Sequence, residues 1–223
     1  MQAMLTSYES WLKKVIRELR SYPTNDELFN LWNDSLPSLE MENSARVRRE
    51  NFRKYFSYWL ENPPRLMLIG EAPGYAGSRF TGISFTSERI IHGGWLPDFM
   101  KRLKLKTTSK KTEGYSEQSA TIIWRELIKV DCPIALFMTV PWHPHQRGKP
   151  LTNRKPRKDE ISAGISILEL FLGAFAKTQF VAVGKVAEHA LKSLGVQVVY
   201  LRHPAQGGAK KFREGFEALV KSL

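Results

Sequence analysis

The chain has 223 residues, of which 42% are hydrophobic, and this is enough to bury one substantial core within a single domain. Lysine and arginine total 34 against 22 aspartate and glutamate, which gives a formal net charge of +12. A surplus of this size attracts polyanions, so DNA, RNA and anionic membrane surfaces all fit it. The charge therefore indicates a polyanionic partner but does not distinguish among these three.

Cysteine usage and the N-terminal residues exclude several classes of protein. The single cysteine, Cys132, rules out an intramolecular disulfide, a cysteine-based zinc site and a cysteine-ligated iron–sulfur cluster. The first residues carry charges throughout, and no stretch approaches the ~20 apolar residues of a membrane span. We therefore expect an intracellular, cytoplasmic protein without a membrane partner.

The N-terminal part of the chain is predicted to be helical. Apolar side chains recur at helical spacing in two segments: Trp11, Val15, Ile16 and Leu19 in the first, and Phe52, Tyr55, Phe56 and Trp59 in the second. Between them, the capping residues Thr24-Asn25-Asp26-Glu27 predict the start of a further helix. Residues 1–62 are thus expected to form a helical extension packed on a single domain of residues 1–223.

From residue 63 onward the pattern changes to short apolar runs, each followed by a loop and a helical segment. The runs cover residues 65–69, 134–139, 179–183 and 197–201. Strands that alternate with helices predict an α/β fold of three layers, α/β/α, with a central, mostly parallel four-stranded sheet. In such sheets the ligand crevice lies at the carboxyl ends of the strands, so the loops there should carry the chemistry.

Three of these loops have unusual sequences, and we expect them to meet in space. They are Gly70-Glu71-Ala72-Pro73-Gly74, Val140-Pro141-Trp142-His143-Pro144-His145 and Arg202-His203-Pro204-Ala205-Gln206-Gly207-Gly208. Taken in this order, from about residue 66 to the C-terminus, they resemble the uracil-DNA glycosylase superfamily. The most similar branch has a first motif Gly-x-Ala-Pro-Gly that runs on into Thr-Gly-x-x-Phe, which is here Thr81-Gly82-Ile83-Ser84-Phe85.

The resemblance implies a DNA glycosylase that flips a deaminated base, most plainly uracil, out of DNA and hydrolyses its N-glycosidic bond without a cofactor. Such a site must extract the base, stabilise an anion and deliver water. By resemblance, Phe85 stacks on the flipped base and His203 donates a hydrogen bond to the pyrimidine O2. Water activation or oxocarbenium stabilisation falls to Glu71 or Glu88, with Glu88 slightly favoured. Either carboxylate could instead hold loop N–H groups in a structural role.

Further site residues follow from the same resemblance. The base pocket is expected to include residues of the first loop and the end of the second strand: Gly70, Ala72, Pro73, Gly74 and Thr139. The last loop is expected to enter the DNA where the base has left: Pro204, Ala205, Gln206 and Gly207. A basic segment is expected to contact DNA: Lys149, Asn153, Arg154 and Lys155. A solvated basic loop is the alternative for this segment.

The chain also departs from the family pattern. The nearest branches carry four cysteines that bind an iron–sulfur cluster. Here the part of the fold that the cluster would brace must instead be held by packing, for which the N-terminal helices are the candidate. Thr139 stands where several relatives have an asparagine that reads uracil, and Gly74 where the most uracil-specific branch has a tyrosine that excludes 5-methyl groups. Asn153 replaces a histidine that crosslinks to abasic sites in another branch. Without the asparagine and the tyrosine, selectivity for uracil should be looser, so hypoxanthine and xanthine are candidate substrates beside uracil.

Other functions fit the sequence as well. The chain could be a catalytically weak or inactive DNA-binding module of the same fold, or an unrelated α/β hydrolase acting on nucleotides. The lack of a P-loop or a nucleophile elbow counts against the hydrolase. His143 and His145 could ligate a metal ion, but no third ligand is evident nearby, so no metal is expected. A monomer is expected because members of the family are usually monomeric.

Overall fold

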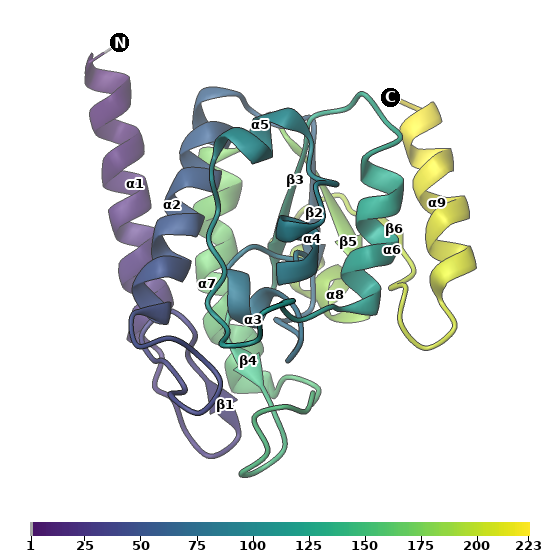
Figure 1. Cartoon of the computed structure of the whole chain (residues 1–223). Coiled ribbons are helices and arrows are strands. Elements are labelled where there is room, and N and C mark those ends of the chain that lie inside the picture. The colour runs from purple at the N-terminus through teal and green to yellow at the C-terminus, as the bar shows by residue number, and fades with distance from the viewer. Residues whose placement is uncertain (1) are drawn as a thin grey trace.

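The structure, a computed structural model, describes residues 2–223 and has a sheet covered by helices on both faces (Figure 1). Four strands form the sheet in the order β3-β2-β5-β6, and every neighbouring pair is parallel. Their bounds are β2 Leu66–Gly70, β3 Ile134–Met138, β5 Gln179–Val183 and β6 Val199–Leu201. The predicted three-layer α/β fold is thus confirmed, with strand ends that differ from the prediction by at most two residues.

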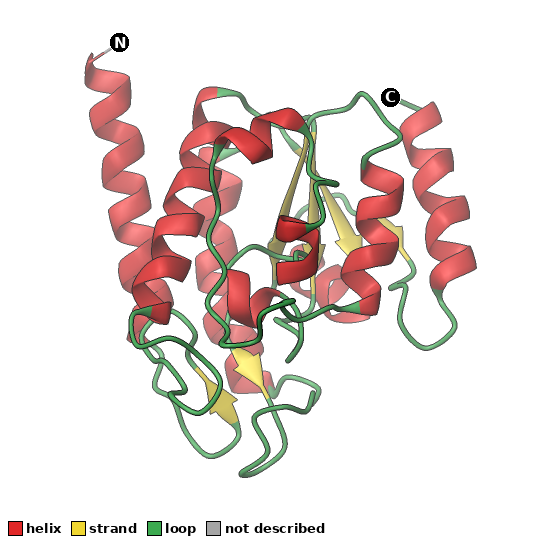
Figure 2. Cartoon of the chain, viewed as in Figure 1, coloured by secondary structure: helices red, strands yellow, loops and turns green. Residues whose placement is uncertain are grey.

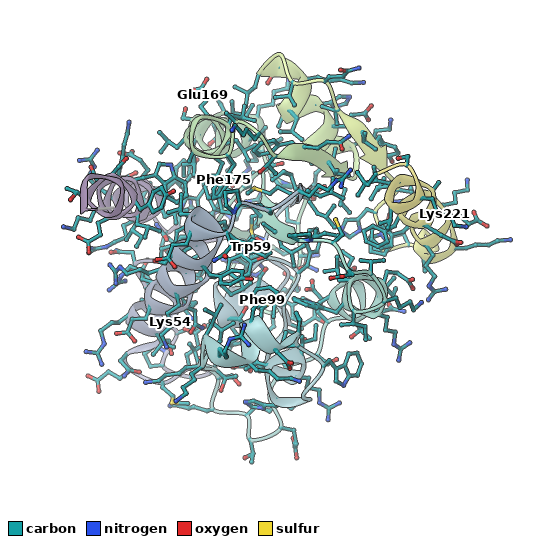
Figure 3. The ribbon with its side chains drawn as sticks, turned by 90° about the horizontal axis from the view of Figure 1, so that it is seen from above. Lys54, Trp59, Phe99, Glu169, Phe175 and Lys221 are labelled. Carbon is teal, nitrogen blue, oxygen red and sulfur yellow. The ribbon has the colours of Figure 1, made fainter. Side chains whose placement is uncertain are left out.

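Nine helices of the described chain surround this sheet. They are α1 (Gln2–Ser21), α2 (Ser44–Glu61), α3 (Ser78–Thr81), α4 (Glu88–His92), α5 (Asp98–Arg102), α6 (Gln118–Leu127), α7 (Lys158–Ala174), α8 (Lys185–Ser193) and α9 (Ala209–Lys221). α6 contacts α9, and α7 contacts α8 and α1. Seen from above, Trp59 and Phe175 lie in the interior, while Glu169 and Lys221 lie at the periphery (Figure 3). No helix in the described residues is long and apolar enough to cross a membrane.

The strands of the sheet are apolar because both of its faces are covered. Every residue of β2 and β3 is buried, as expected for parallel strands between two layers of helices. Both predicted helical faces of the N-terminal segment are also confirmed. Val15 and Leu19 of α1, together with Phe52 and Trp59 of α2, are at most 1% exposed and belong to the same core.

The helix predicted to begin at residues 24–27 is absent, and that prediction is wrong. The Asn25 side chain accepts a hydrogen bond from the Glu27 N–H at 2.9 Å, and Asn25 and Leu28 form an isolated β-bridge. The chain then forms β1 (Leu28–Phe29), which pairs antiparallel with β4 (His143–Pro144). An asparagine side chain that could cap a helix here closes a turn, because the same acceptor serves both structures.

The N-terminal extension holds the second of the three loops in place. The Trp32 indole N–H donates to the carbonyl oxygen of Pro141 at 2.6 Å, and the Trp142 indole N–H donates to that of Leu19 at 2.8 Å. Both indoles are 1% exposed, so these bonds are sheltered from water. The β1–β4 pairing joins the same two segments. This chain therefore braces its second loop with residues of the extension.

Gly164 of α7 packs against the end of β3 and gives a stability prediction. A Cβ at this position would lie 2.0 Å from the Thr139 carbonyl oxygen, which is backbone. We therefore expect Gly164→Ala to destabilise the fold by ~1–3 kcal/mol, although alanine is the better helix former. Gly173→Ala in the same helix meets nothing within 4 Å and should raise stability by up to ~1 kcal/mol. Thermal unfolding checks both, and a Gly164→Ala midpoint at or above the wild-type value would contradict the close contact.

Candidate active site

The three loops meet at the carboxyl ends of the strands, at the end of the molecule where the long loops gather (Figure 2). The Thr139 N–H donates to the Gly70 carbonyl oxygen at 2.9 Å, and the His143 Nδ1 lies 2.8 Å from that of Pro73. From the last loop, the His203 ring lies 6.2 Å from the Phe85 ring, measured between centroids. The predicted meeting of the loops is confirmed.

A small cavity lies among these segments. Its volume is about 30 Å³, and its lining comes from the first loop, α3, the segment between α3 and α4, the start of α6, β3 and the last loop. The residues that line it are Gly70, Ala72, Ser78, Ser84, Phe85, Glu117, Ser119, Met138 and His203. A space of this size holds about one water molecule. Its walls must therefore move before a nucleobase can enter.

Phe85 forms one wall of the cavity in a strained backbone conformation. Its φ is +51°, in the left-handed region that bulky residues rarely adopt and that costs roughly 1–3 kcal/mol. The ring lies directly over Gly70, where a Cβ would come within 2.3 Å of the Phe85 Cζ. The glycine of the first motif is thus needed to let this ring cover the backbone. An aromatic face held at a cavity wall is suited to stacking on a planar base.

His203 presents a neutral imidazole to the cavity. Burial, reinforced by the charge of Arg202, lowers the pKa of His203 to about 4. Its Nδ1 accepts a hydrogen bond from the Ala205 N–H at 3.1 Å, so the ring proton of the neutral form sits on Nε2. At neutral pH the residue is therefore an uncharged N–H donor with a fixed tautomer.

Glu117 also lines the cavity, and the sequence reasoning missed it. It is the N-cap residue of α6, and its carboxylate lies against the first loop. A Cβ at Gly74 or at Gly77 would come within 2.0 Å of a Glu117 carboxylate oxygen. Among the described residues this carboxylate has no hydrogen-bond or ion-pair partner, and burial raises its pKa to about 7. In the sequence, the only local indication of a role for Glu117 is its position as an acidic residue just before an amphipathic helical segment.

Comparison with known families agrees with this arrangement. The model of the uracil DNA glycosylase superfamily matches residues 58–223, a range that contains all three loops, Phe85 and Glu117. The chain belongs to this superfamily. No curated protein matches the chain. The superfamily match begins inside α2, so α1 and β1 lie outside it.

Of the two carboxylates predicted for this superfamily site, Glu88 does not reach the cavity. It is 0% exposed, and its carboxylate accepts hydrogen bonds from the N–H groups of Thr108, Ser109 and Tyr115 and from the Ser109 hydroxyl. All of these donors belong to the segment between α5 and α6. Glu88 thus has the structural role that the sequence left open, and the slight preference for it as the water-activating residue is not supported.

Glu71 lies beside the cavity without lining it. The side chain is partly exposed, and burial raises its pKa while the charge of Lys155 opposes the shift. Its neighbours Gly70 and Ala72 line the cavity, whereas Glu71 does not. The first-loop acid of the family motif therefore lies toward the basic segment in this chain.

Three other predicted site residues serve the fold. The Thr139 hydroxyl donates to the Gly70 carbonyl oxygen at 3.0 Å, so it is engaged with backbone and does not line the cavity. Arg154 forms a two-pronged ion pair with Glu160, at 2.6 and 3.0 Å, and also donates to the Glu27 carbonyl oxygen. Pro204 is buried. Because their polar groups are used or covered, these residues are poorly placed to contact a base or a phosphate.

The other predicted DNA-contacting residues are accessible. Gln206 and Gly207 are exposed at the tip of the last loop, with φ values of +52° and +73°, and Ala205 is partly exposed. Lys149, Asn153 and Lys155 are exposed. The Asn153 side chain accepts a hydrogen bond from the Tyr75 N–H at 3.0 Å, which ties the basic segment to the first loop.

The second-loop histidines are packed into the protein. His143 is 0% exposed, and its two ring nitrogens lie 2.8 and 3.0 Å from the carbonyl oxygens of Pro73 and Pro150. Burial lowers the pKa of His143 to about 4. In the part of the chain that the structure describes, no three histidine, cysteine or acidic side chains are grouped to hold a metal ion. His143 is therefore a residue that joins loops.

Proposed function

We propose that the protein is a monofunctional DNA glycosylase that removes a deaminated base, with uracil as the first substrate to test. It would act as a monomer, without a cofactor. The observation that carries this proposal is the cavity in which Phe85, His203 and Glu117 stand together at the carboxyl end of the sheet. These three side chains supply a stacking face, an uncharged donor and a carboxylate, which are the groups that glycosidic cleavage needs.

In the proposed reaction the flipped base stacks on Phe85, and the His203 Nε2–H donates to a carbonyl oxygen of the base. The N-glycosidic bond breaks, and its electron pair leaves with the base, whose oxygen gains negative charge that this donor stabilises. The water oxygen bonds to C1′, and Glu117 accepts one water proton, which then returns to the base through solvent. A carboxylate whose pKa is about 7 is well matched to this proton transfer near neutral pH.

The same geometry predicts low selectivity among deaminated bases. The Thr139 hydroxyl is bonded to the Gly70 carbonyl oxygen, so no side-chain amide at this position reads the uracil edge. Hypoxanthine and xanthine therefore belong in the substrate set beside uracil. We also propose that the exposed tip at Gln206 and Gly207 enters the duplex when the base leaves it.

The second candidate function is a DNA-binding module that has lost catalysis. The observation that favours it is the cavity volume of about 30 Å³, which is too small for a base unless the walls move. Such a module would bind DNA with strong salt dependence and leave every glycosidic bond intact.

Excision from end-labelled duplexes separates the two candidates. Each duplex carries one uracil, hypoxanthine, xanthine or thymine opposite guanine, and alkali converts abasic sites into breaks. We expect breaks at one or more of these lesions, with the rate reduced about 10²-fold in His203→Ala, because one anion-stabilising donor is removed. The exposed His92→Ala variant serves as the control and should match the wild type. DNA binding with no breaks at any lesion would leave the binding module as the function.

A further inference from the structure

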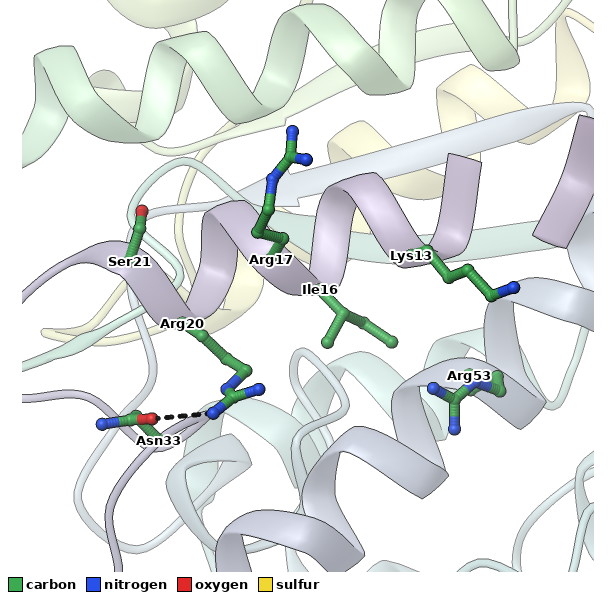
Figure 4. A pocket seen from close by; sticks show the side chains of 7 residues that line it. All are labelled: Lys13, Ile16, Arg17, Arg20, Ser21, Asn33 and Arg53. Atoms are coloured by element: carbon green, nitrogen blue, oxygen red, sulfur yellow. Dashed lines mark hydrogen bonds between the residues drawn. The ribbon is translucent and has the colours of Figure 1, made fainter. Parts of the chain in front are cut away.

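A basic groove lies between α1 and α2, outside the part of the chain that the superfamily model matches. Its volume is about 360 Å³, and four of its lining residues are cations: Lys13, Arg17, Arg20 and Arg53. In the part of the chain that the structure describes, no acidic residue lines it. Figure 4 shows Lys13 and Arg20 extending from α1 and Arg53 from α2, with Ile16 between them. The groove thus gathers positive charge over a small apolar floor.

Three of the four cations in this groove are poorly neutralised within the described residues, whereas the fourth, Arg17, pairs with Glu18 at 3.1 Å. Arg20 makes one weak contact, at 3.5 Å to the Asn33 side chain, and neither Arg20 nor Arg53 has a carboxylate within ion-pair distance. Lys13 lies 4.0 Å from Glu9 with both side chains about three-quarters exposed, a pair that contributes little. Cations held together without acids repel one another, and a bound anion would relieve that repulsion.

The pKa of Arg49, a neighbouring residue of α2, responds to the charge of two of the groove cations. Burial lowers its pKa, and the nearby charges of Arg20, Arg48 and Arg53 lower it further. Only Glu50 acts in the opposite direction. The basic groove is therefore a region of positive potential made by both helices.

The spacing of the cations fits a chain of phosphates better than a single small anion. Lys13 and Arg20 are seven residues apart on one face of α1, which corresponds to about 10 Å along the helix axis. One strand of a duplex advances about 3.4 Å along the DNA axis per phosphate, so a duplex whose axis runs along α1 would pass roughly three phosphates over this distance. Arg53 approaches the same groove from α2.

The position of the groove connects it to the candidate active site. Arg20 is the penultimate residue of α1, and this end of α1 lies at the end of the molecule that holds β1, β4 and α3 (Figure 1). DNA whose flipped base occupies the cavity extends past the protein on both sides. We propose that the basic groove is a second DNA-binding site, which holds backbone phosphates of the strand that flanks the lesion. This inference rests on the proposed glycosylase function.

The test compares two triple variants that remove the same charge. Lys13→Ala/Arg20→Ala/Arg53→Ala removes the groove cations, and Lys210→Ala/Lys211→Ala/Lys221→Ala removes three exposed cations of α9, on the opposite side of the molecule. Fluorescence anisotropy measures the Kd of each for a short duplex limited to the lesion and for a long flanked duplex, at 50–200 mM salt. Excision at saturating DNA is measured alongside.

For the long duplex, the groove variant should lower the salt slope of log Kd by about 2.7, at about 0.9 for each of the three lost phosphate contacts. Between 50 and 200 mM salt the wild type should then lose roughly 40-fold more affinity than this variant. The short duplex, the α9 variant and the excision rate at saturating DNA should be unchanged. Equal effects of the two variants, or of the two duplex lengths, would overturn the groove as a site. A wild type that neither binds nor cuts DNA would instead overturn the proposed function.

Discussion

Glu117→Gln is expected to reduce the rate constant of base excision by about 10²–10⁴-fold, the usual contribution of a positioned general base. Glu117 is the one carboxylate in the described chain that lines the cavity with Phe85 and His203. Glutamine keeps the size of the side chain against Gly74 and Gly77 but cannot accept the water proton. Single-turnover excision at saturating enzyme measures the loss, and affinity for lesion DNA should change little.

The excision rate of the wild type is expected to rise with pH below neutrality. Burial raises the pKa of Glu117 from 4.5 to about 7, so the ionised, proton-accepting form accumulates as pH rises toward 7. The logarithm of the rate should increase with pH below about 7 and level off above it. Folding stability should change in the opposite direction. The folded state holds the Glu117 proton more tightly than the unfolded state, so this contribution is present below pH 4.5 and is lost as pH rises through 7.

Two matched variants decide whether Glu117 has this role. Glu71→Gln should have a smaller effect on the rate and should keep the rise toward pH 7. Glu88→Gln should lower stability first, because an amide cannot accept from all the donors that Glu88 now satisfies. The assignment fails if Glu71→Gln abolishes excision while Glu117→Gln retains the wild-type rate and pH profile.

The fold could be predicted because its determinants are local. Continuous apolar runs such as residues 134–138 between helical segments specify parallel strands covered on both faces, and β3 is buried throughout. The segment at residues 24–27 failed because Asn25 can close a turn as well as cap a helix, and only the partner strand β4 decides between them. No local pattern contains that partner.

The residues of the candidate site also fall into two groups, those that a sequence motif indicates and those that only packing determines. Phe85 and His203 could be proposed from the sequence because each belongs to a motif that resembles one of the family, Phe85 in the segment after α3 and His203 in the loop after β6. Glu117 could not, since it reaches the cavity only through the packing of α6 against Gly74 and Gly77. Glu88 and Arg154 have the residue types that the chemistry needs, but their hydrogen bonds are taken up inside the protein. The sequence specifies which groups are present, whereas packing decides which of them remain free to react.

Glu40→Gln is expected to destabilise the protein by ~3–5 kcal/mol, the usual effect of leaving a buried charge unpaired. Glu40 lies 3.1 Å from Arg48 and 3.1 Å from Arg79, and all three side chains are 0% exposed. The Arg79 guanidinium is also held between the rings of Phe29 and Phe80, at 4.7 and 4.6 Å, and its nitrogens make no hydrogen bonds to residues 2–223. One carboxylate thus pairs with two buried cations, and its loss removes the ion-pair partner of both.

Thermal unfolding should show this loss as a fall in Tm of roughly 6–20 °C, at ~2–4 °C per kcal/mol for a chain of this size. The control is Glu50→Gln, which breaks the exposed 3.8 Å pair with Arg46 and should cost less than ~1 kcal/mol. Adding Arg79→Met to Glu40→Gln should recover part of the stability, because methionine fills the space between the rings without a charge. A Glu40→Gln midpoint as high as that of Glu50→Gln would mean that the two arginines do not depend on Glu40. Because Arg79 lies in α3, next to the cavity-lining Ser78, its ion pair with Glu40 links the N-terminal extension to the cavity.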